Sequence, residues 1–156
     1  RRSRWSGEGC GEGSGEDAWM CRPRSPGRFV AMAQYHLYGD AAGETHLEPL
    51  EMAVKETFAG TVRALNDIPA TTMGMGEFVG RKPDVGVHHA PRRQFLVVLG
   101  GELEIVTTLG QQQRLQPGDV LLADDVESKG HISRDVGDAP LMLMAIGIGS
   151  DWEGPT

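Results

Sequence analysis

The stretch GVHHAPRRQFLVVLGGELEIVTTLGQQQRLQPGDVLLADDVESKGH, residues 86–131, decides the fold of this chain. It contains two apolar runs of strand character, Phe95–Leu99 and Val120–Ala123, with turn residues between them. These turn residues are Gly100-Gly101, Gly110 and Pro117-Gly118-Asp119. Glycine tolerates positive φ and proline presets φ for a turn, so the stretch predicts short strands joined by tight turns.

The same rhythm of short strands and turns extends on both sides, from Thr45 to Ile148. Strands at intervals of about 8–12 residues without a convincing helix predict an all-β sandwich or barrel. Residues 53–60 are interpreted as irregular chain, and Met73, Met75, Met142 and Met144 as core filler or cavity lining. The expected strands are Thr45–Leu50, Thr61–Leu65, Ala70–Val79, Gln94–Leu99, Glu102–Thr108, Gln111–Leu115, Val120–Ala123, His131–Asp135 and Leu141–Ile148.

Composition limits the classes of protein to consider. A chain of 156 residues has the length of one domain, and a net charge of −7 argues against a nucleic-acid-binding face. No apolar run approaches the roughly 18 residues of a membrane span. Both cysteines, Cys10 and Cys21, precede residue 32, so the remaining chain has neither a disulfide nor a cysteine-ligated metal. We therefore expect a cytoplasmic protein with no membrane or nucleic-acid partner.

Residues 1–31 differ in composition from the rest. Gly, Ser, Arg and Pro dominate, with six arginines against four acidic residues. Such a segment cannot bury enough apolar surface to offset its ordering entropy. It lacks the apolar core of a secretory signal and has too many acids for a transit peptide. We expect a disordered or non-native extension, with translation starting at Met32 or Met20 and Met32 favoured, followed by one domain over 32–156.

A possible metal site comes from His88, Gln94 and His131. His88 and Gln94 are separated by an even step, so on a regular strand their side chains share one face. His131 lies beyond the next hairpins, on a strand that can reach the same interior point. Two imidazoles and an amide oxygen suit Zn²⁺, Fe²⁺, Ni²⁺ or Mn²⁺, with water at open positions. The alternative is that each histidine only makes hydrogen bonds within a polar pocket.

Further candidates flank this set. Arg92 is expected to face inward and bind a carboxylate or enolate oxygen, whereas Arg93 is more easily interpreted as solvated. Asp125 ends a strand beside the expected cavity and is a candidate general base or additional ligand; its alternative role is an Asx turn. His89 should point to the opposite face from His88. No G-x-S-x-G motif is present, which leaves a nucleophile elbow without support.

The motifs in this region resemble those of small single-domain cupins of the RmlC-like type. The first cupin motif, G-x5-H-x-H-x3,4-E-x6-G, is similar to His88-x-Ala90-x3-Gln94-x6-Gly101, with Ala90 and Gln94 replacing a histidine and a glutamate. The second, G-x5-P-x-G-x2-H-x3-N, is similar to Gly110 through Pro117-Gly118-Asp119 and His131. The segments HAPRRQF, PGD, LLADD and KGH further resemble a group of small bacterial-type cupins of unassigned activity.

The resemblance implies a jelly-roll (double-stranded β-helix) barrel with little or no helix, a homodimer and a small-molecule site. Metal ligands would be His88, Gln94 and His131. His131 or Asp125 would move a proton and Arg92 would orient an anion. An isomerase, lyase or dioxygenase acting on a small carboxylate or carbonyl compound fits this set. A metal-free small-molecule-binding module and a homodimer with a vestigial site remain as alternatives.

Overall fold

The computed structural model describes residues 32–52, 54–57, 62–65, 67–78 and 86–154. These residues contain strands and no helix, which confirms the prediction of an all-β chain. The expected extension over residues 1–31 lies outside the described residues. The strands are β1 Gln34–Gly39, β2 Thr45–Pro49, β3 Val54–Thr57, β4 Val62–Leu65, β5 Ala70–Glu77, β6 Val87–His88, β7 Gln94–Gly100, β8 Leu103–Val106, β9 Gln112–Leu115, β10 Val120–Asp124, β11 His131–Asp135 and β12 Met142–Ile148.

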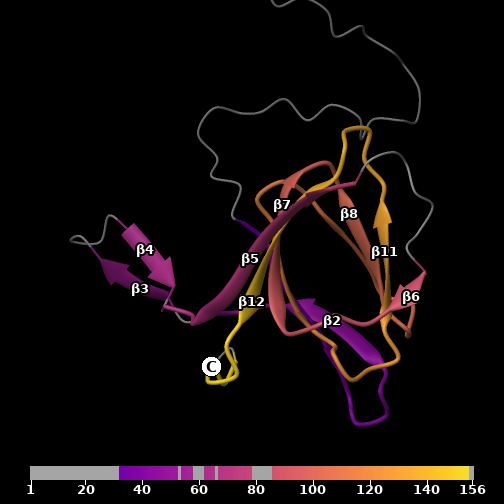
Figure 1. Ribbon diagram of the computed structural model, residues 1–156, viewed down its shortest axis with the longest axis horizontal. Helices are drawn as coiled ribbons and strands as arrows, with labels where there is room; N and C mark the ends of the chain where they lie inside the picture. The colour runs from indigo at the N-terminus through magenta and orange to yellow at the C-terminus, as the bar shows by residue number, and fades with distance from the viewer. Residues whose placement is uncertain (1–31, 53, 58–61, 66, 79–85, 155–156) are drawn as a thin grey trace, which may run out of the picture. The chain divides into compact units, whose positions relative to one another are not determined.

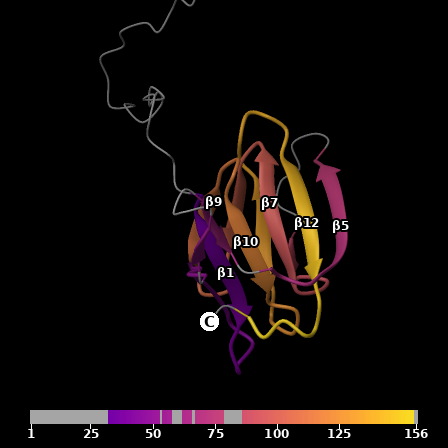
Figure 2. The same cartoon turned by 90° about the vertical axis from the view of Figure 1, so that its left-hand side faces the viewer.

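Ten of these strands form two larger sheets (Figure 1). The six-stranded sheet has the order β2-β1-β10-β7-β12-β5, and Figure 2 shows the labelled strands β1, β10, β7, β12 and β5 side by side. The four-stranded sheet has the order β6-β11-β8-β9, and β3 and β4 form a separate two-stranded sheet. Hydrogen bonds between the described strands do not close the two larger sheets into a barrel, in contrast to the predicted barrel. They share a core, as the two sheets of a β-sandwich do.

The shared core lies between the two sheets. Leu37, Leu121 and Val98 come from the six-stranded sheet, and Leu103 and Ile105 from the four-stranded sheet; all are at most 1% exposed. Alternate residues of each strand point to this core because the side-chain period of a strand is two. We call the core side of the six-stranded sheet its inner face. On β7 it carries residues 94, 96 and 98.

A second cluster covers the outer face of the six-stranded sheet. It contains Phe95, Leu122 and Ile148, together with Leu50 from the chain after β2. Trp152, after the last strand, packs against it with its ring 5.7 Å from the Phe95 ring. The six-stranded sheet is therefore partly covered on both faces, which explains the continuous apolar character of β7.

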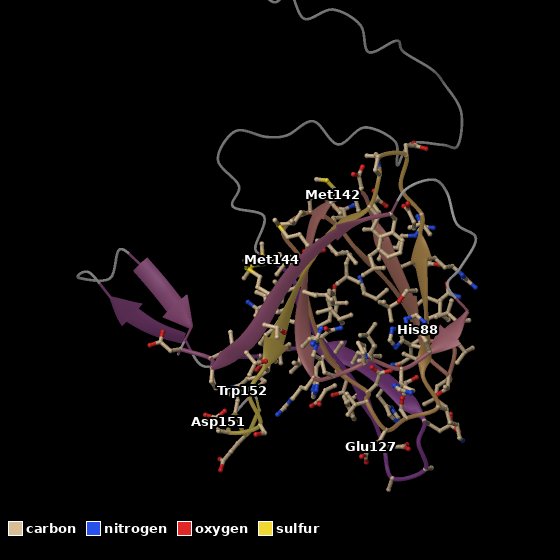
Figure 3. All side chains as sticks on the ribbon, in the orientation of Figure 1. His88, Glu127, Met142, Met144, Asp151 and Trp152 are labelled. Carbon is tan, nitrogen blue, oxygen red and sulfur yellow. The ribbon has the colours of Figure 1, made fainter. Side chains whose placement is uncertain are left out.

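Several sequence predictions need correction. The strands β1, β3 and β6 were not expected, and β3 occupies chain that was interpreted as irregular. Met73, Met75 and Met142 are exposed by 69%, 70% and 41%, so they do not fill the core; the labelled side chains of Met142 and Met144 appear in Figure 3. None of the described residues forms a helix long and apolar enough to cross a membrane.

Candidate functional site

His88 and His131 lie next to each other on adjacent strands of the four-stranded sheet. β6 pairs antiparallel with β11, and the register places the two residues directly opposite one another. Their ring centres are 4.5 Å apart with an angle of 55° between the planes. His131 is 4% exposed and His88 is half-buried; Figure 3 labels His88 at β6. The structure thus brings together two residues that are 43 positions apart in the sequence.

Gly130 permits this close approach. Its φ is +90°, and a Cβ atom at this position would lie 2.6 Å from the carbonyl oxygen of His88. Any side chain would therefore push β6 away from the start of β11. The carbonyl of Gly130 accepts a hydrogen bond of 3.0 Å from the hydroxyl of Thr45, which is fully buried. Gly130 and Thr45 were not identified from the sequence, although the glycine directly before His131 was a usable signal.

Hydrogen bonds fix the same tautomer in both imidazoles. His88 Nδ1 is 2.9 Å from the carbonyl oxygen of Gly86, and His131 Nδ1 is 2.7 Å from Oδ2 of Asp125. A carbonyl or carboxylate oxygen can only accept, so Nδ1 carries the proton in each ring. In the neutral rings the lone pair then lies on Nε2. Metal-binding histidines typically have this arrangement, with the other ring nitrogen donating to a carbonyl or carboxylate.

Asp125 is fully buried and connects the two histidine segments. Besides His131 Nδ1, its carboxylate accepts a hydrogen bond of 3.2 Å from the backbone N–H of Ala90. Its carbonyl accepts hydrogen bonds from the backbone and hydroxyl of Ser128, which closes the turn after β10. The turn is closed by the backbone carbonyl of Asp125 and not by its carboxylate, so it is not the Asx turn considered from the sequence; the carboxylate orients His131. Because the carboxylate is occupied by protein donors, its effect on a ligand acts through His131.

Gln94 lies on the inner face of β7. Its register partners are Ala123 on β10 and Gly147 on β12, so only small residues flank it. Asp125 follows Ala123 by two residues on the same face, a separation of about 7 Å along a strand. Gln94 is 8% exposed, yet its amide makes no hydrogen bond to another described residue, including either imidazole. Because the amide is not bound to another described residue, its oxygen is available to a ligand.

Arg92 and Arg93 point to different environments. Arg92 is exposed, and its Cδ lies beside Gly147, at 3.3 Å from the position of an added Cβ. Arg93 instead pairs with Asp124 at 3.1 Å and donates a hydrogen bond of 2.7 Å to the carbonyl of Trp152, over whose ring it lies. Arg93 therefore anchors the chain after β12 and is not the solvated residue expected.

His89 lies outside the imidazole pair, as expected. The residue is exposed, and its Nδ1 is 3.1 Å from the carbonyl oxygen of Ala90. It therefore offers a natural control for experiments on His88.

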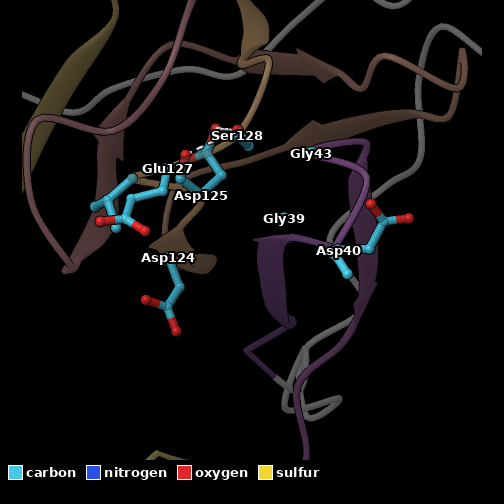
Figure 4. A pocket seen from close by; sticks show the side chains of 9 residues that line it. Gly39, Asp40, Gly43, Asp124, Asp125, Glu127 and Ser128 are labelled. Atoms are coloured by element: carbon cyan, nitrogen blue, oxygen red, sulfur yellow. Dashed lines mark hydrogen bonds between the residues drawn. The ribbon is translucent and has the colours of Figure 1, made fainter.

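A cavity of about 420 Å³ lies between the β1–β2 turn and the β10–β11 loop (Figure 4). Two of its carboxylates are already engaged, since Asp40 accepts a hydrogen bond of 2.9 Å from His46 and Asp124 pairs with Arg93. We therefore place the candidate site at the imidazole pair. The cavity is lined by Gly39, Asp40, Ala41, Gly43, Asp124, Asp125, Val126, Glu127 and Ser128, and so excludes both site histidines and Gln94.

The donor set is small for a metal centre. No cluster of three or more His, Cys, Asp or Glu side chains suited to a metal occurs among the described residues. The available donors are the Nε2 atoms of His88 and His131 and the amide oxygen of Gln94. A scan against models of known protein families found no match for this chain, and a search of curated proteins found none either.

Proposed function

We propose that β5–β12 form a jelly roll of the cupin kind. The support is the pairing of the strands, which is nested: β5 with β12, β6 with β11, β7 with β10 and β8 with β9, all antiparallel. A single long hairpin that is wound up once produces this set. The additional pairs β7–β12 and β8–β11 are those that winding brings together. Eight strands in two such sheets are typical of jelly rolls, including cupins.

Within this fold, His88, Gln94 and His131 hold a divalent metal ion. The observation that carries the proposal is the pair of imidazoles, 4.5 Å apart, whose Nδ1 atoms are both anchored to oxygen acceptors. Two neutral nitrogen donors and an amide oxygen fit a borderline ion such as Zn²⁺, Fe²⁺, Ni²⁺ or Mn²⁺. So few protein ligands leave coordination positions for a substrate.

The substrate is a small carboxylate or carbonyl compound, and the reaction is an isomerisation, a lyase reaction or a dioxygenation. A bound divalent ion supplies Lewis-acid polarisation of a substrate oxygen. Arg92, beside Gly147 at the edge of the site, orients the anionic part of the substrate. Asp125 holds the Nδ1 proton of His131 and so keeps Nε2 directed at the ligand.

The alternative is a metal-free binding module. His131 Nε2 cannot hold a metal ion and a proton at the same time, so the two functions exclude each other at this atom. Without metal, Nε2 of His131 accepts a proton or a hydrogen bond from the ligand, and the carboxylate of Asp125 stabilises the resulting imidazolium. Turnover is not required in this case.

Metal analysis of protein purified without an affinity tag tests the proposal. We expect about one divalent ion per chain after reconstitution, lost in His88→Ala and in His131→Ala. His89→Ala, which changes the exposed neighbouring histidine, is the matched control and should retain the metal. If no ion binds under any reconstitution, the metal centre is refuted. A ligand-induced rise in Tm that depends on His131 would then identify the binding module.

The homodimer expected from the resemblance stays a prediction. β5 is the edge of the six-stranded sheet, and every residue from Ala70 to Glu77 is exposed. Edge strands usually carry charges, prolines or bulges that block pairing. β5 contains neither proline nor a charged residue before Glu77, and its bulge is confined to its start, at residue 71. A second copy that adds its own β5 antiparallel would bring the Met73 and Met75 side chains of both copies together.

A further inference from the structure

The inner face of the six-stranded sheet carries no side chain at Gly147, and side chains of neighbouring polar residues cover this position. Gly147 lies opposite Gln94 on β7 and opposite Thr72 on β5. A Cβ atom at Gly147 would lie 2.5 Å from the hydroxyl oxygen of Thr72, 3.1 Å from that of Thr71 and 3.3 Å from Cδ of Arg92. Side chains of three polar residues from two separate segments therefore gather around Gly147.

A β-bulge explains why two successive threonines reach the same point. The register pairs Gly147 with Thr72 but Ile148 with Ala70, which leaves Thr71 as the extra residue of β5. In a regular strand Thr71 and Thr72 would point to opposite faces. A bulge disrupts this alternation and re-aims a side chain, and bulges are over-represented next to active sites.

The groups around Gly147 lack protein partners. In the described part of the chain, the guanidinium of Arg92 and the hydroxyls of Thr71 and Thr72 form no hydrogen bond or ion pair. The neighbouring Arg93 shows the contrast, since it is bound to Asp124 and Trp152. Gln94, next to Gly147, is more than nine-tenths buried and also unbonded within the described residues. Because Arg92, Thr71 and Thr72 are exposed, their donors can bind an incoming anion in place of solvent without breaking a contact within the described residues.

We propose that Arg92, Thr71 and Thr72 form an anion subsite around Gly147 that binds the carboxylate of a small organic ligand. A planar guanidinium and two hydroxyl donors match the two oxygens of a carboxylate, and a single cation balances its single charge. Gln94 lies opposite Gly147 on β7 and is the third ligand of the proposed metal site. The inference rests on the proposed function for the position of the other end of the ligand, but the subsite itself does not need a metal.

Calorimetric titration of the whole protein with small carboxylates of two to six carbons, from acetate to adipate, tests the subsite. The titrations are done on protein treated with EDTA and on protein loaded with Zn²⁺, with the corresponding neutral amides and inorganic phosphate as comparison ligands. We expect at least one carboxylate to bind and its amide not to bind. Failure of the whole series, or equal binding of amide or phosphate, would overturn the proposal.

Variants then assign the binding to these residues. Arg92→Gln changes an exposed side chain and should weaken carboxylate binding about tenfold or more, the usual effect of losing a charged hydrogen bond. Arg114→Gln, on the four-stranded sheet and 58% exposed, is the matched control and should bind within twofold of the parent protein. Thr72→Val should weaken binding and Thr72→Ser should restore it. Unchanged affinity in Arg92→Gln would refute the subsite.

Gly147→Ala provides an independent test, since its Cβ would displace the hydroxyl of Thr72 while every donor group is kept. We expect loss of carboxylate binding, with Arg92→Gln as the fallback if this variant does not fold. Carboxylate binding by EDTA-treated protein that takes up no metal would refute the metal centre and support the subsite. Metal binding without any carboxylate binding would support the metal centre and refute the subsite.

Discussion

The carboxylate of Asp125 and the imidazole of His131 form a buried pair, with Oδ2 and Nδ1 2.7 Å apart and side-chain exposures of 0% and 4%. Asp125 also receives the backbone N–H of Ala90, two residues after His88. One side chain therefore determines the orientation of His131 and the path of the chain that carries His88. This double role makes Asp125 the residue through which the site is most easily perturbed.

The substitution Asp125→Asn should weaken metal binding. The amide oxygen can still accept from the N–H of Ala90, but the amide nitrogen cannot accept the Nδ1 proton of His131. We expect a loss of about 10–100-fold in Zn²⁺ affinity, measured by competition with a chelating dye. Glu127→Gln, an exposed carboxylate in the same loop, should leave the affinity unchanged. Equal affinities in the two variants would contradict the role assigned to Asp125.

The substitution Gly130→Ala should separate the two histidines. Its Cβ would meet the carbonyl of His88 at 2.6 Å, and its φ of +90° is unfavourable for alanine. Gly110→Ala is the control, because Gly110 has a φ of +79° with no atom within 4 Å of an added Cβ. Backbone strain alone costs about 1–3 kcal/mol. We expect a larger loss of unfolding free energy in urea for Gly130→Ala, together with a loss of metal.

Because Leu121 packs in the shared core, the substitution Leu121→Ala should strongly lower the free energy of unfolding. This side chain is fully buried on the inner face of β10, and cavities of this kind cost about 2–5 kcal/mol. Leu109→Ala removes the same atoms at a position that is 55% exposed, so its effect should stay within about 0.5 kcal/mol. Urea denaturation measures both. Similar losses would mean that Leu121 does not pack between the sheets as described.

Acid should loosen the β1–β2 turn. A hydrogen bond from His46 lowers the pKa of Asp40, and a hydrogen bond from Lys129 lowers the pKa of Glu44. Both pKa values are higher in the unfolded chain, so the contacts contribute their full stability above about pH 4–5 and lose it as the pH falls through the folded values. The contribution is small because both groups are exposed.

Amide exchange of residues 40–44 between pH 6 and pH 3 measures this loosening, after correction for intrinsic rates. The double variant Asp40→Asn, Glu44→Gln should show faster exchange at pH 6 and little further change with acid. An identical acid response in the parent protein and the variant would mean that other groups control the turn.

Pairing through β5 should be sensitive to charge. Met75→Lys places an ammonium group at a position that is 70% exposed on this edge strand. We expect a dimeric parent protein to become monomeric, as measured by sedimentation. Leu109→Lys, an exposed substitution in the β8–β9 turn, should leave the dimer intact. A monomeric parent protein would refute the homodimer.

Local sequence patterns predicted most of the strands because turn residues mark their ends. β11 begins and ends where it was expected, and β7, β9, β10 and β12 differ by one residue at an end. β1 was missed although Tyr35 and Leu37 alternate with polar residues, a period-two signal that was present in the sequence. β6 has only two residues, which is too short for any period to appear.

The sheet assignment and part of the site depend on contacts between distant residues. The even step from His88 to Gln94 did not place the two residues on one strand as expected, because the chain around Pro91 separates β6, in the four-stranded sheet, from β7, in the six-stranded sheet. The subsite residue Thr71 was not predictable, because its direction depends on a bulge that only the pairing with β12 creates. Exposure of Met73 and Met75 likewise follows from β5 being an edge, which no local pattern reveals.

The parallel pairing of β1 with β10 has a consequence for biosynthesis. Ala33 and Asp119, which flank this pair, are joined by a hydrogen bond across 86 residues of sequence. At translation rates of about 5–20 residues per second, the ribosome needs several seconds to deliver the second strand after the first. During this interval the apolar side of β1, including Leu37, has only β2 to pair with. Nascent chains stalled before residue 120 should therefore recruit holdase chaperones, and chains extended beyond residue 148 should release them.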